Sequence, residues 1–278
     1  MVGATGRIGG RVAEELMHAD VPVRALTRSA DHEGRVPEGA EVVVGDLTAP
    51  RSLDEALTGV ETVFLVWAAP PATVPAVIDR LAASVRRVVF LASPHQVPHP
   101  FFQQPNPMAA LHADIEARLA ATGLETTVVR PGMFASNALA WWAPAVREGK
   151  AVRWPYGAAE TAPVDDRDVA AVAARTLTES GHVGRDYVLT GPESLTQAEQ
   201  VARIGEVLHR PVEFVDLTPE EFRAEAKGWP PAALDMLLSA WEATLNHPAH
   251  VTTDVADVLG RAHTYTDWLQ AHAHAFTP

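Results

Sequence analysis

The chain opens with MVGATGRIGG, Met1 to Gly10, and this stretch decides the fold. Gly3, Gly6 and Gly9 form a G-x-x-G-x-x-G pattern that runs directly into a helical apolar stripe. In such a turn one glycine tightens the bend, one lets the backbone approach a pyrophosphate, and one lets the helix pack on the sheet. The helix N-terminus then offers free N–H groups to phosphates. Taken alone, the motif also fits a glycine-rich turn that binds nothing.

The strand before this turn is unusually short. Only Met1 and Val2 precede Gly3, whereas the first strand of a dinucleotide-binding unit normally contributes several buried residues before its glycines. Two explanations stay open: the sequence starts late relative to the natural gene product, or Val2 alone reaches the core and a very short strand suffices. A cofactor site at Gly3–Gly9 requires that Met1 and Val2 pair with the sheet.

Composition excludes several classes of function. The 278 residues are enough for one α/β domain with a smaller lobe, and a net charge of −13 disfavours binding to nucleic acid or acidic membranes. The absence of cysteine rules out disulfides and thiolate metal sites. The histidines of the 95–108 segment, together with His112, do not form a convincing set of metal ligands, and no segment reads as a signal peptide or membrane span. We therefore expect a cytoplasmic monomer or homodimer without a metal, whose partner is a small molecule.

Short apolar runs alternate with helical patterns, which is typical of βαβ units and a parallel sheet. Predicted strands cover 21–28, 41–46, 62–68, 86–93, 124–132, 185–191 and 211–217, and predicted helices cover 7–19, 51–60, 73–85, 107–123, 164–180 and 195–210. We expect an α/β fold: a Rossmann-type doubly wound parallel sheet with a smaller, mainly helical C-terminal substrate lobe. The NADP-binding domain is predicted at 1–135 with 164–191 returning to it, and the substrate lobe at 136–163 and 192–278.

An arginine at the end of the second predicted strand favours NADPH as the cofactor. Arg28 lies where the adenosine ribose of a dinucleotide would be, and arginine there suits a 2′-phosphate, whereas an acidic residue would favour NAD. Arg7 is a second candidate for that phosphate. Asp46 is placed to meet the adenine edge but equally suits a cap of the following segment. The predicted cofactor-binding residues are Gly3, Thr5, Gly6, Arg7, Ile8, Gly9, Arg28, Asp46, Leu47, Trp67, Pro131 and Met133.

Motifs along the chain resemble those of the NmrA-like, atypical branch of the short-chain dehydrogenase/reductase superfamily. They are GATGRIGG, VRALTRS, VVGDLTAPRSLDEAL, HADIEARLAATGLETTVVRPGMFASN, RDVAAVAARTL and YVLTGPESLTQAEQVARIGEVLHRPV. The resemblance runs from Gly3 to about Pro211. It implies the fold and the cofactor strongly and the substrate only weakly.

The catalytic pattern that the superfamily implies, Tyr-x-x-x-Lys, does not occur. The tyrosines are Tyr156, Tyr187 and Tyr265, and four residues after them stand Glu160, Gly191 and Leu269. When the family helix is aligned on Glu116, His112 takes the lysine position and Met108 the tyrosine position. Because methionine cannot donate a proton, the usual acid is missing.

Three side chains are candidates to replace it. His112 carries a proton near neutral pH, Ser93 ends a predicted strand at the edge where α/β ligands bind, and His95 follows two residues later. Each also has a plain structural alternative, such as a strand-end cap for Ser93 or a loop histidine without a role for His95. A further hypothesis is that the substrate supplies its own proton through a neighbouring phenol or enol.

Aromatic and apolar residues outside the regular pattern predict a wide, flat substrate cleft, although each of them alone more often packs in a core. The predicted substrate contacts are Phe101, Met108, Phe134, Trp141, Trp154 and Tyr156, and the proline-rich 95–108 segment is predicted to form a flap. Among family members without the tyrosine, the chain resembles angucyclinone ketoreductases. We predict an NADPH-dependent ketoreductase of a polycyclic aromatic polyketide in antibiotic biosynthesis; the alternatives are an NADP-binding redox sensor without catalysis and a quinone or double-bond reductase.

Overall fold

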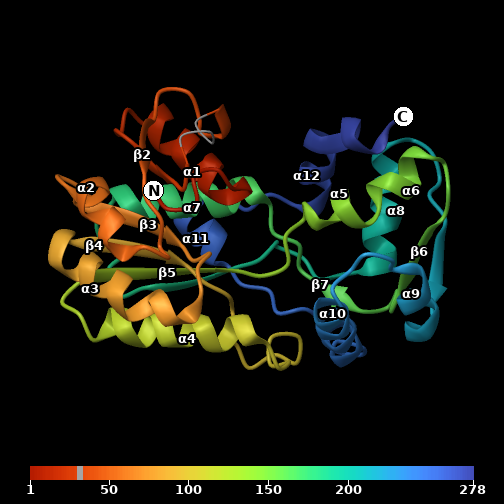
Figure 1. Cartoon of the computed structure of the whole chain (residues 1–278). Coiled ribbons are helices and arrows are strands. Elements are labelled where there is room, and N and C mark those ends of the chain that lie inside the picture. The colour runs from red at the N-terminus through yellow and green to blue at the C-terminus, as the bar shows by residue number, and fades with distance from the viewer. Residues whose placement is uncertain (30–33) are drawn as a thin grey trace. The chain divides into compact units, whose positions relative to one another are not determined.

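The structure, a computed structural model of the chain, describes residues 1–29 and 34–278 (Figure 1). The chain forms two compact units, each built from three segments. Unit 1 comprises Met1–Ser93, Pro107–Pro131 and Arg167–Val188, and unit 2 comprises Pro94–Asn106, Gly132–Asp166 and Leu189–Pro278. The residues 94–106, which the sequence analysis kept within 1–135, belong with unit 2: the His99 ring, for example, is hydrogen-bonded to the carbonyl of Pro248 at 2.9 Å.

Unit 1 has the predicted Rossmann-type sheet with helices on both faces. Its strands are β1 (Arg24–Thr27), β2 (Glu41–Val44), β3 (Thr62–Val66), β4 (Arg87–Leu91), β5 (Glu125–Pro131) and β8 (Asp186–Leu189). They pair in the order β1-β2 and β3-β4-β5-β8, with β1–β2, β3–β4 and β4–β5 parallel. The central strands are almost entirely buried, which explains why β3 and β4 are continuous apolar runs.

Five helices cover this sheet. They are α1 (Arg7–His18), α2 (Leu53–Leu57), α3 (Val74–Ser84), α4 (Pro107–Ala120) and α7 (Asp166–Thr178), with short 3-10 turns η2 (Pro50–Ser52) and η3 (Pro71–Thr73) among the described residues. In Figure 1, α3 and α4 lie on one face of the sheet, and α1 and α7 on the other. This arrangement brings the carboxyl ends of the parallel strands to one edge, where ligands of α/β proteins bind.

Two residues, Met1 and Val2, join the two halves of the sheet. The Val2 N–H donates to the carbonyl of Phe64 in β3 at 2.9 Å, and the Leu26 N–H of β1 donates to the carbonyl of Met1 at 2.9 Å. Val2 thereby forms an isolated parallel bridge with Leu26. The pairing that a cofactor site at Gly3–Gly9 requires is present, although it is reduced to a bridge.

The α-amine of Met1 makes the stability of unit 1 depend on pH. Burial first, and the positive charge of Arg24 second, lower the pKa of this amine from 8.0 to about 5. Between these values the unfolded amine holds a proton that the folded one has lost, so the free energy of unfolding rises with pH. We expect a gain of about 2–3 kcal/mol between roughly pH 5.5 and 7.5 from this group.

Urea unfolding at several pH values, with an Nα-acetylated protein as the control, isolates this contribution from that of the histidines. The acetylated protein has no amine to titrate, so its stability is expected to change less steeply across the same interval. Equal slopes for the two proteins would show that the amine is not buried in solution.

Unit 2 is mainly helical, with two small sheets. Its strands are β6 (Val152–Pro155), β7 (Glu160–Thr161), β9 (Leu195–Thr196) and β10 (Phe214–Leu217), paired as parallel β6–β10 and antiparallel β7–β9. Its helices are α5 (Asn137–Trp141), α6 (Ala143–Arg147), α8 (Gln197–Val207), α9 (Pro219–Glu225), α10 (Pro231–Ala243), α11 (Asp254–Leu259) and α12 (Tyr265–His272), followed by the 3-10 turn η4 (Ala273–Phe276). The helix predicted at 195–210 is α8, and Thr196 and Glu199 form a complete capping box at its N-terminus.

Tryptophans form the core of unit 2. Trp142 and Trp241 are buried to 1% and 0% exposure, and Trp154 lies within 6.2 Å and 5.6 Å of their rings. Trp141 stacks on Trp154 with ring centroids 5.5 Å apart. The segment that appeared irregular in sequence is therefore folded around its own aromatic residues, because these large side chains bury the most apolar area.

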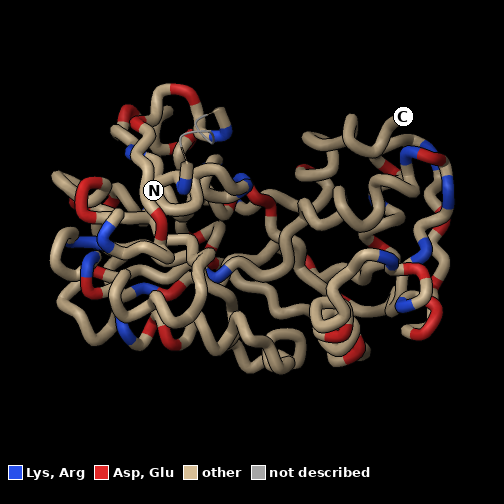
Figure 2. The backbone as a smooth tube through the Cα atoms, viewed as in Figure 1, with Lys and Arg blue, Asp and Glu red and all other residues tan. Residues whose placement is uncertain are grey.

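Charged residues of both signs are distributed along both units, as the red and blue positions in Figure 2 show. Many of them are ion pairs on the surface, such as Arg153–Glu225 at 2.7 Å and Arg203–Glu193 at 2.6 Å. Among residues 1–29 and 34–278, no helix has the length and apolar character needed to cross a membrane.

Candidate functional site

The glycine turn between Val2 and α1 is built without room for side chains. Gly3 has a φ of +84°, and the Gly6 N–H donates to its carbonyl at 2.9 Å. A Cβ on Gly9 would lie 2.1 Å from the Gly3 carbonyl oxygen, and one on Gly3 would lie 2.9 Å from the Val66 Cβ. Helix α1 therefore packs directly on the turn, as the third glycine of a dinucleotide motif is expected to allow.

The N-terminus of α1 differs from those of α8, α9 and α12. Thr196, Thr218 and Thr264 cap the latter three helices, each with an acidic partner in the first turn. The N-cap of α1 is Gly6, and within the part of the chain described here no side chain caps it and its first turn holds no acidic residue. Its N–H groups and the positive end of its dipole suit an anionic group, so these residues fit the pyrophosphate of a dinucleotide.

The predicted cofactor residues fall into two groups in unit 1. Thr5, Gly6, Arg7 and Arg28 are exposed, with Arg28 directly after the last residue of β1. Leu47 and Trp67 are 7% and 6% exposed and belong to the core beneath the sheet edge, together with the buried Ile8 and Gly9. The buried residues pack in the interior of unit 1, and the exposed ones lie at its surface.

Asp46 has a structural role in the loop after β2. Its carboxylate accepts a hydrogen bond from the Thr48 N–H at 2.8 Å, and its own N–H donates to the Ser52 hydroxyl at 2.8 Å. Asp46 therefore orders the loop itself and does not cap the following helices, whose N-cap residues are Ala49 and Ser52. A contact between Asp46 and an adenine ring stays a prediction.

Arg28 provides a test of cofactor choice. An Arg28→Ala variant is expected to bind NADPH about 10–100-fold more weakly while its affinity for NADH changes less than about threefold, because only NADPH carries the 2′-phosphate. Titration of protein fluorescence with each dinucleotide measures both affinities. Arg35→Ala removes another arginine of unit 1 and serves as the control. An equal loss for both dinucleotides would assign Arg28 no role at the 2′ position.

Ser93 and His112 meet beyond the end of β4. The His112 Nδ1 lies 3.0 Å from the Ser93 Oγ, and the histidine is 8% exposed. Its ring packs edge-on against Phe90, with centroids 5.4 Å apart. Strand β4 positions the serine and helix α4 the histidine, so two of the three predicted catalytic residues are in hydrogen-bond contact.

Arg130, near the end of β5, holds both elements of this pair. Its guanidinium, 2% exposed, donates to the Ser93 carbonyl at 2.9 Å and to both carboxylate oxygens of Glu116 in α4 at 2.7 Å, and it pairs with Asp186 at 2.5 Å. Burial alone lowers the pKa of Arg130, but the hydrogen bonds to Glu116 and Asp186 outweigh it and leave the pKa raised. Arg130 is a positioning residue that the sequence analysis did not assign; the Arg-Pro-Gly strand end was its only signal.

Met108 and His95 are placed differently from the Ser93–His112 pair. Met108, at the position of the family tyrosine, lies in the first turn of α4 and is 45% exposed. His95 belongs to unit 2, where its carbonyl accepts a hydrogen bond from the Gln103 side chain at 3.0 Å.

The predicted substrate residues of unit 2 also divide. Phe101 lines a small cavity of about 20 Å³ together with Phe102 and with Met133, which was predicted to contact the cofactor. Trp154 belongs to the tryptophan core, and Phe101, Trp141 and Tyr156 pack against that core. Trp141 and Trp154 also line a separate cavity of about 400 Å³.

Pro131 and Phe134 border the end of β5. Pro131 is buried as the last residue of that strand, and Phe134 forms an isolated bridge with Val164 in unit 2. The Met133 carbonyl accepts from the Val164 N–H at 2.8 Å, and its sulfur accepts from the Asn137 amide at 2.9 Å. Contacts of Pro131 and Met133 with a cofactor stay predictions.

Comparison with known proteins agrees with this description. The NAD(P)H-binding family model matches residues 3–180. One relative is the (4-alkanoyl-5-oxo-2,5-dihydrofuran-3-yl)methyl phosphate reductase of Streptomyces griseus, which is 39% identical; the alignment covers 100% of this chain and 99% of the relative. Another is the NAD(P)H azoreductase of Xenophilus azovorans, which is 32% identical; the alignment covers 99% of this chain and 98% of the relative. The NADPH-dependent quinone oxidoreductase QOR2 of Escherichia coli superimposes with a TM-score of 0.82 at 26% identity, over 98% of each chain.

These matches establish the cofactor as NADPH and the protein as an NAD(P)H-dependent oxidoreductase. They also establish the family. The glycine turn, the sheet order and the Arg-Pro-Gly sequence at the end of β5 indicate the same family. The chain belongs to the NAD(P)H-binding, NmrA-like branch of the atypical short-chain dehydrogenases/reductases.

Proposed function

We propose that this protein is an NADPH-dependent reductase of conjugated acceptors, such as an unsaturated lactone, an enone or a quinone. The observation that carries the proposal is the replacement of the family's acid by Met108, exposed at the first turn of α4, beside a Ser93–His112 pair. A conjugated acceptor spreads the incoming negative charge onto an oxygen, where a hydrogen-bond donor suffices to stabilise it. An isolated ketone needs a stronger acid at the carbonyl itself.

Ser93 and His112 supply that donor. With both imidazole nitrogens protonated, His112 donates from Nδ1 to the Ser93 Oγ across 3.0 Å and leaves the serine O–H for the substrate oxygen. As that oxygen gains charge, the serine proton passes to it and the Nδ1 proton of His112 passes to the serine, which leaves a neutral imidazole. Bound NADPH supplies the hydride. Arg130 keeps the serine and the helix of the histidine in place through its bonds to the Ser93 carbonyl and to Glu116.

The names of the relatives support this class of substrate. One reduces a phosphate ester of an acyl-dihydrofuranone, another an azo compound and a third a quinone, and each of these acceptors is a conjugated double bond. The relative with 39% identity makes an acyl-butenolide phosphate the first compound to try.

A ketone of a polycyclic aromatic polyketide, of the angucyclinone type, is a second candidate. A neighbouring phenol would polarise such a carbonyl through an internal hydrogen bond, which also relieves the need for an enzymatic acid. The edge-to-face pair of Phe101 and Phe102, 5.1 Å apart in unit 2, is the aromatic surface that favours it. The Ser93–His112 pair serves both candidates.

A substrate panel separates the two candidates. NADPH consumption is measured with an acyl-butenolide with and without phosphate, a quinone, an azo dye, a hydroxylated polycyclic ketone and a saturated ketone of similar size. We expect the conjugated acceptors to react at least about 100-fold faster than the saturated ketone, or ~2.7 kcal/mol in barrier. Preference for the saturated ketone contradicts the proposal, preference for the polycyclic ketone selects the second candidate, and tight NADPH binding without turnover would favour a redox sensor.

The serine and histidine are tested with the best substrate of that panel. Ser93→Ala and His112→Ala are each expected to lower kcat about 10–100-fold with little change in NADPH affinity. Ser84→Ala, an exposed serine at the end of α3, is the control. If these variants and His95→Ala all stay within about tenfold of the parent, the substrate provides its own proton.

A further inference from the structure

A cavity of about 400 Å³ lies in unit 2 and is lined by one continuous segment of the chain, residues 141–154. Its lining comes from Trp141 at the end of α5, from Ala145 in α6, and from β6 with the two residues before it. Phe101 and Phe102, which line the small cavity of the same unit, are not part of it. This is therefore a separate space, and the proposed reaction involves none of its residues.

Two indole rings form the apolar wall of this cavity. Trp141 stacks on Trp154, with ring centroids 5.5 Å apart and ring planes at 30°. The other apolar residues of the lining are small: Ala145, Ala151 and Val152. The indole N–H of Trp154 is buried and has no acceptor among the described residues, so this ring can adjust to a ligand without losing a hydrogen bond. Such a wall suits a flat ring system.

The charged residues of the lining, Lys150 and Arg153, are both cations. Their carboxylate partners, Glu148 and Glu225, do not line the cavity. Both ion pairs are exposed, with side chains 72% and 59% exposed in the first and 48% and 46% in the second, so each pair contributes little to stability. Arg153 donates to Glu225 from Nε and Nη2, which leaves the N–H groups of Nη1 for another acceptor.

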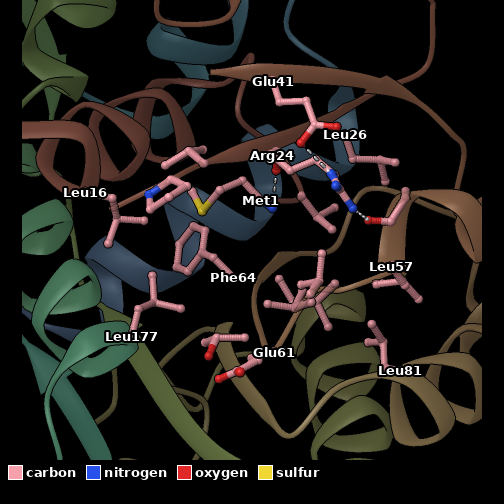
Figure 3. A pocket seen from close by; sticks show the side chains of 18 of the residues that line it. Met1, Leu16, Arg24, Leu26, Glu41, Leu57, Glu61, Phe64, Leu81 and Leu177 are labelled. Atoms are coloured by element: carbon pink, nitrogen blue, oxygen red, sulfur yellow. Dashed lines mark hydrogen bonds and ion pairs between the residues drawn. The ribbon is translucent and has the colours of Figure 1, made fainter. Parts of the chain in front are cut away.

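Unit 1 contains a larger cavity, of about 690 Å³, whose charges are arranged differently (Figure 3). Both members of the Arg24–Glu41 ion pair line it, with the Arg24 Nε 2.8 Å from the Glu41 carboxylate, and Glu61 adds a second carboxylate. The charged side chains of that lining are thus net negative, whereas those of the cavity in unit 2 are net positive. Of the two cavities, the one in unit 2 suits an anion.

We propose that the cavity at 141–154 binds a flat aromatic carboxylate of two or three fused rings. The rings would lie against Trp141 and Trp154, and the carboxylate would accept hydrogen bonds from Arg153 and Lys150. A volume of about 400 Å³ is within the range of sites that hold small organic ligands. A ligand of this site need not be a substrate of the proposed reductase.

The chemistry of the lining selects this class of ligand over others. The planar guanidinium of Arg153 presents its N–H groups in one plane, which matches a carboxylate. A phosphate ester would bring a second negative charge near Glu148 and Glu225, which already accept from the same two cations. A second copy of the chain would need a larger apolar surface than the five apolar side chains of this lining.

Calorimetric titration of the whole chain with 2-naphthoate tests the proposal, and 2-naphthamide serves as a neutral probe of the same shape. We expect a Kd of about 10–100 µM for the carboxylate and at least about tenfold weaker binding of the amide. Saturating NADPH is expected to leave both affinities unchanged, because the cavity is separate from the glycine turn. Equal affinities for the two probes, displacement of naphthoate by NADPH, or no binding below about 1 mM would overturn the proposal.

Three variants locate the bound probe. Arg153→Ala is expected to weaken naphthoate binding about 5–10-fold. Arg223→Ala is the matched control, because Arg223 is 46% exposed, pairs with Asp235 at 3.2 Å in the same unit and does not line the cavity; we expect no change. Ala145→Phe fills the cavity and is expected to weaken naphthoate about tenfold, with circular dichroism as a check of the fold. Equal losses for the two arginine variants, or full binding by a folded Ala145→Phe protein, would place naphthoate elsewhere and overturn the proposal.

Discussion

A Gly9→Ala variant is expected to bind NADPH at least about 100-fold more weakly than the parent, or ~2.7 kcal/mol in binding free energy. The new Cβ would lie 2.1 Å from the Gly3 carbonyl oxygen and 2.6 Å from its carbon, and both are backbone atoms. To relieve this overlap, α1 must move away from the turn, which displaces the N–H groups of its first residues.

Gly10→Ala is the matched control for this variant. It adds the same methyl group to the same helix one residue later, where the Cβ would lie 3.2 Å from the Ala4 carbonyl oxygen. A shift of a few tenths of an ångström accommodates it, so we expect NADPH affinity within about threefold of the parent. Calorimetric titration measures both affinities, and circular dichroism checks the fold. Similar losses at Gly9 and Gly10 would mean that helix propensity or general packing, rather than the turn, determines binding.

An Arg130→Ala variant is expected to lower the free energy of unfolding by about 3–5 kcal/mol. Arg130 is 2% exposed, and its partner Glu116 has a side chain that is 11% exposed. Without the guanidinium, the Glu116 carboxylate stays in a poorly solvated place with its main positive partner gone. The cost comes from that remaining charge more than from the lost attraction.

Two further variants test this reasoning by urea unfolding. Arg118→Ala breaks an exposed pair with Asp114 on the same helix, with side chains 42% and 45% exposed, and is expected to cost less than about 1 kcal/mol. The double variant Arg130→Met/Glu116→Leu removes both buried charges and is expected to recover most of the loss. If the double variant were as unstable as Arg130→Ala, the loss would come from packing around Arg130 instead of the charge on Glu116.

The fold of unit 1 was predictable because local patterns and long-range packing agree there. The continuous apolar runs of β3 and β4 identify strands covered on both faces, and the glycines leading into α1 identify the turn. Ser93 and His112 were predicted as separate candidates for the proton donor, and the structure adds that they are in hydrogen-bond contact.

The contacts of individual side chains in the candidate site and in unit 2 could not be predicted, because residue spacing does not show which partner a side chain packs against or bonds to. Trp154 looked like a cleft residue because its segment lacks regular periodicity, yet Trp142 and Trp241 offer it a larger apolar contact. Asp46 fitted either a ligand contact or a cap of the following segment, and its spacing did not indicate that its carboxylate accepts the Thr48 N–H within the loop.

The alternation of segments between the two units limits how this protein can be recombined. Each unit consists of three segments that alternate along the chain, so the chain passes from one unit to the other five times. A chimaera that takes unit 2 whole from a relative would need five junctions, each preserving strand register and hydrogen bonding. The proposed substrate surface around Phe101 and Phe102 is therefore better varied by point substitutions than by exchange of a whole unit.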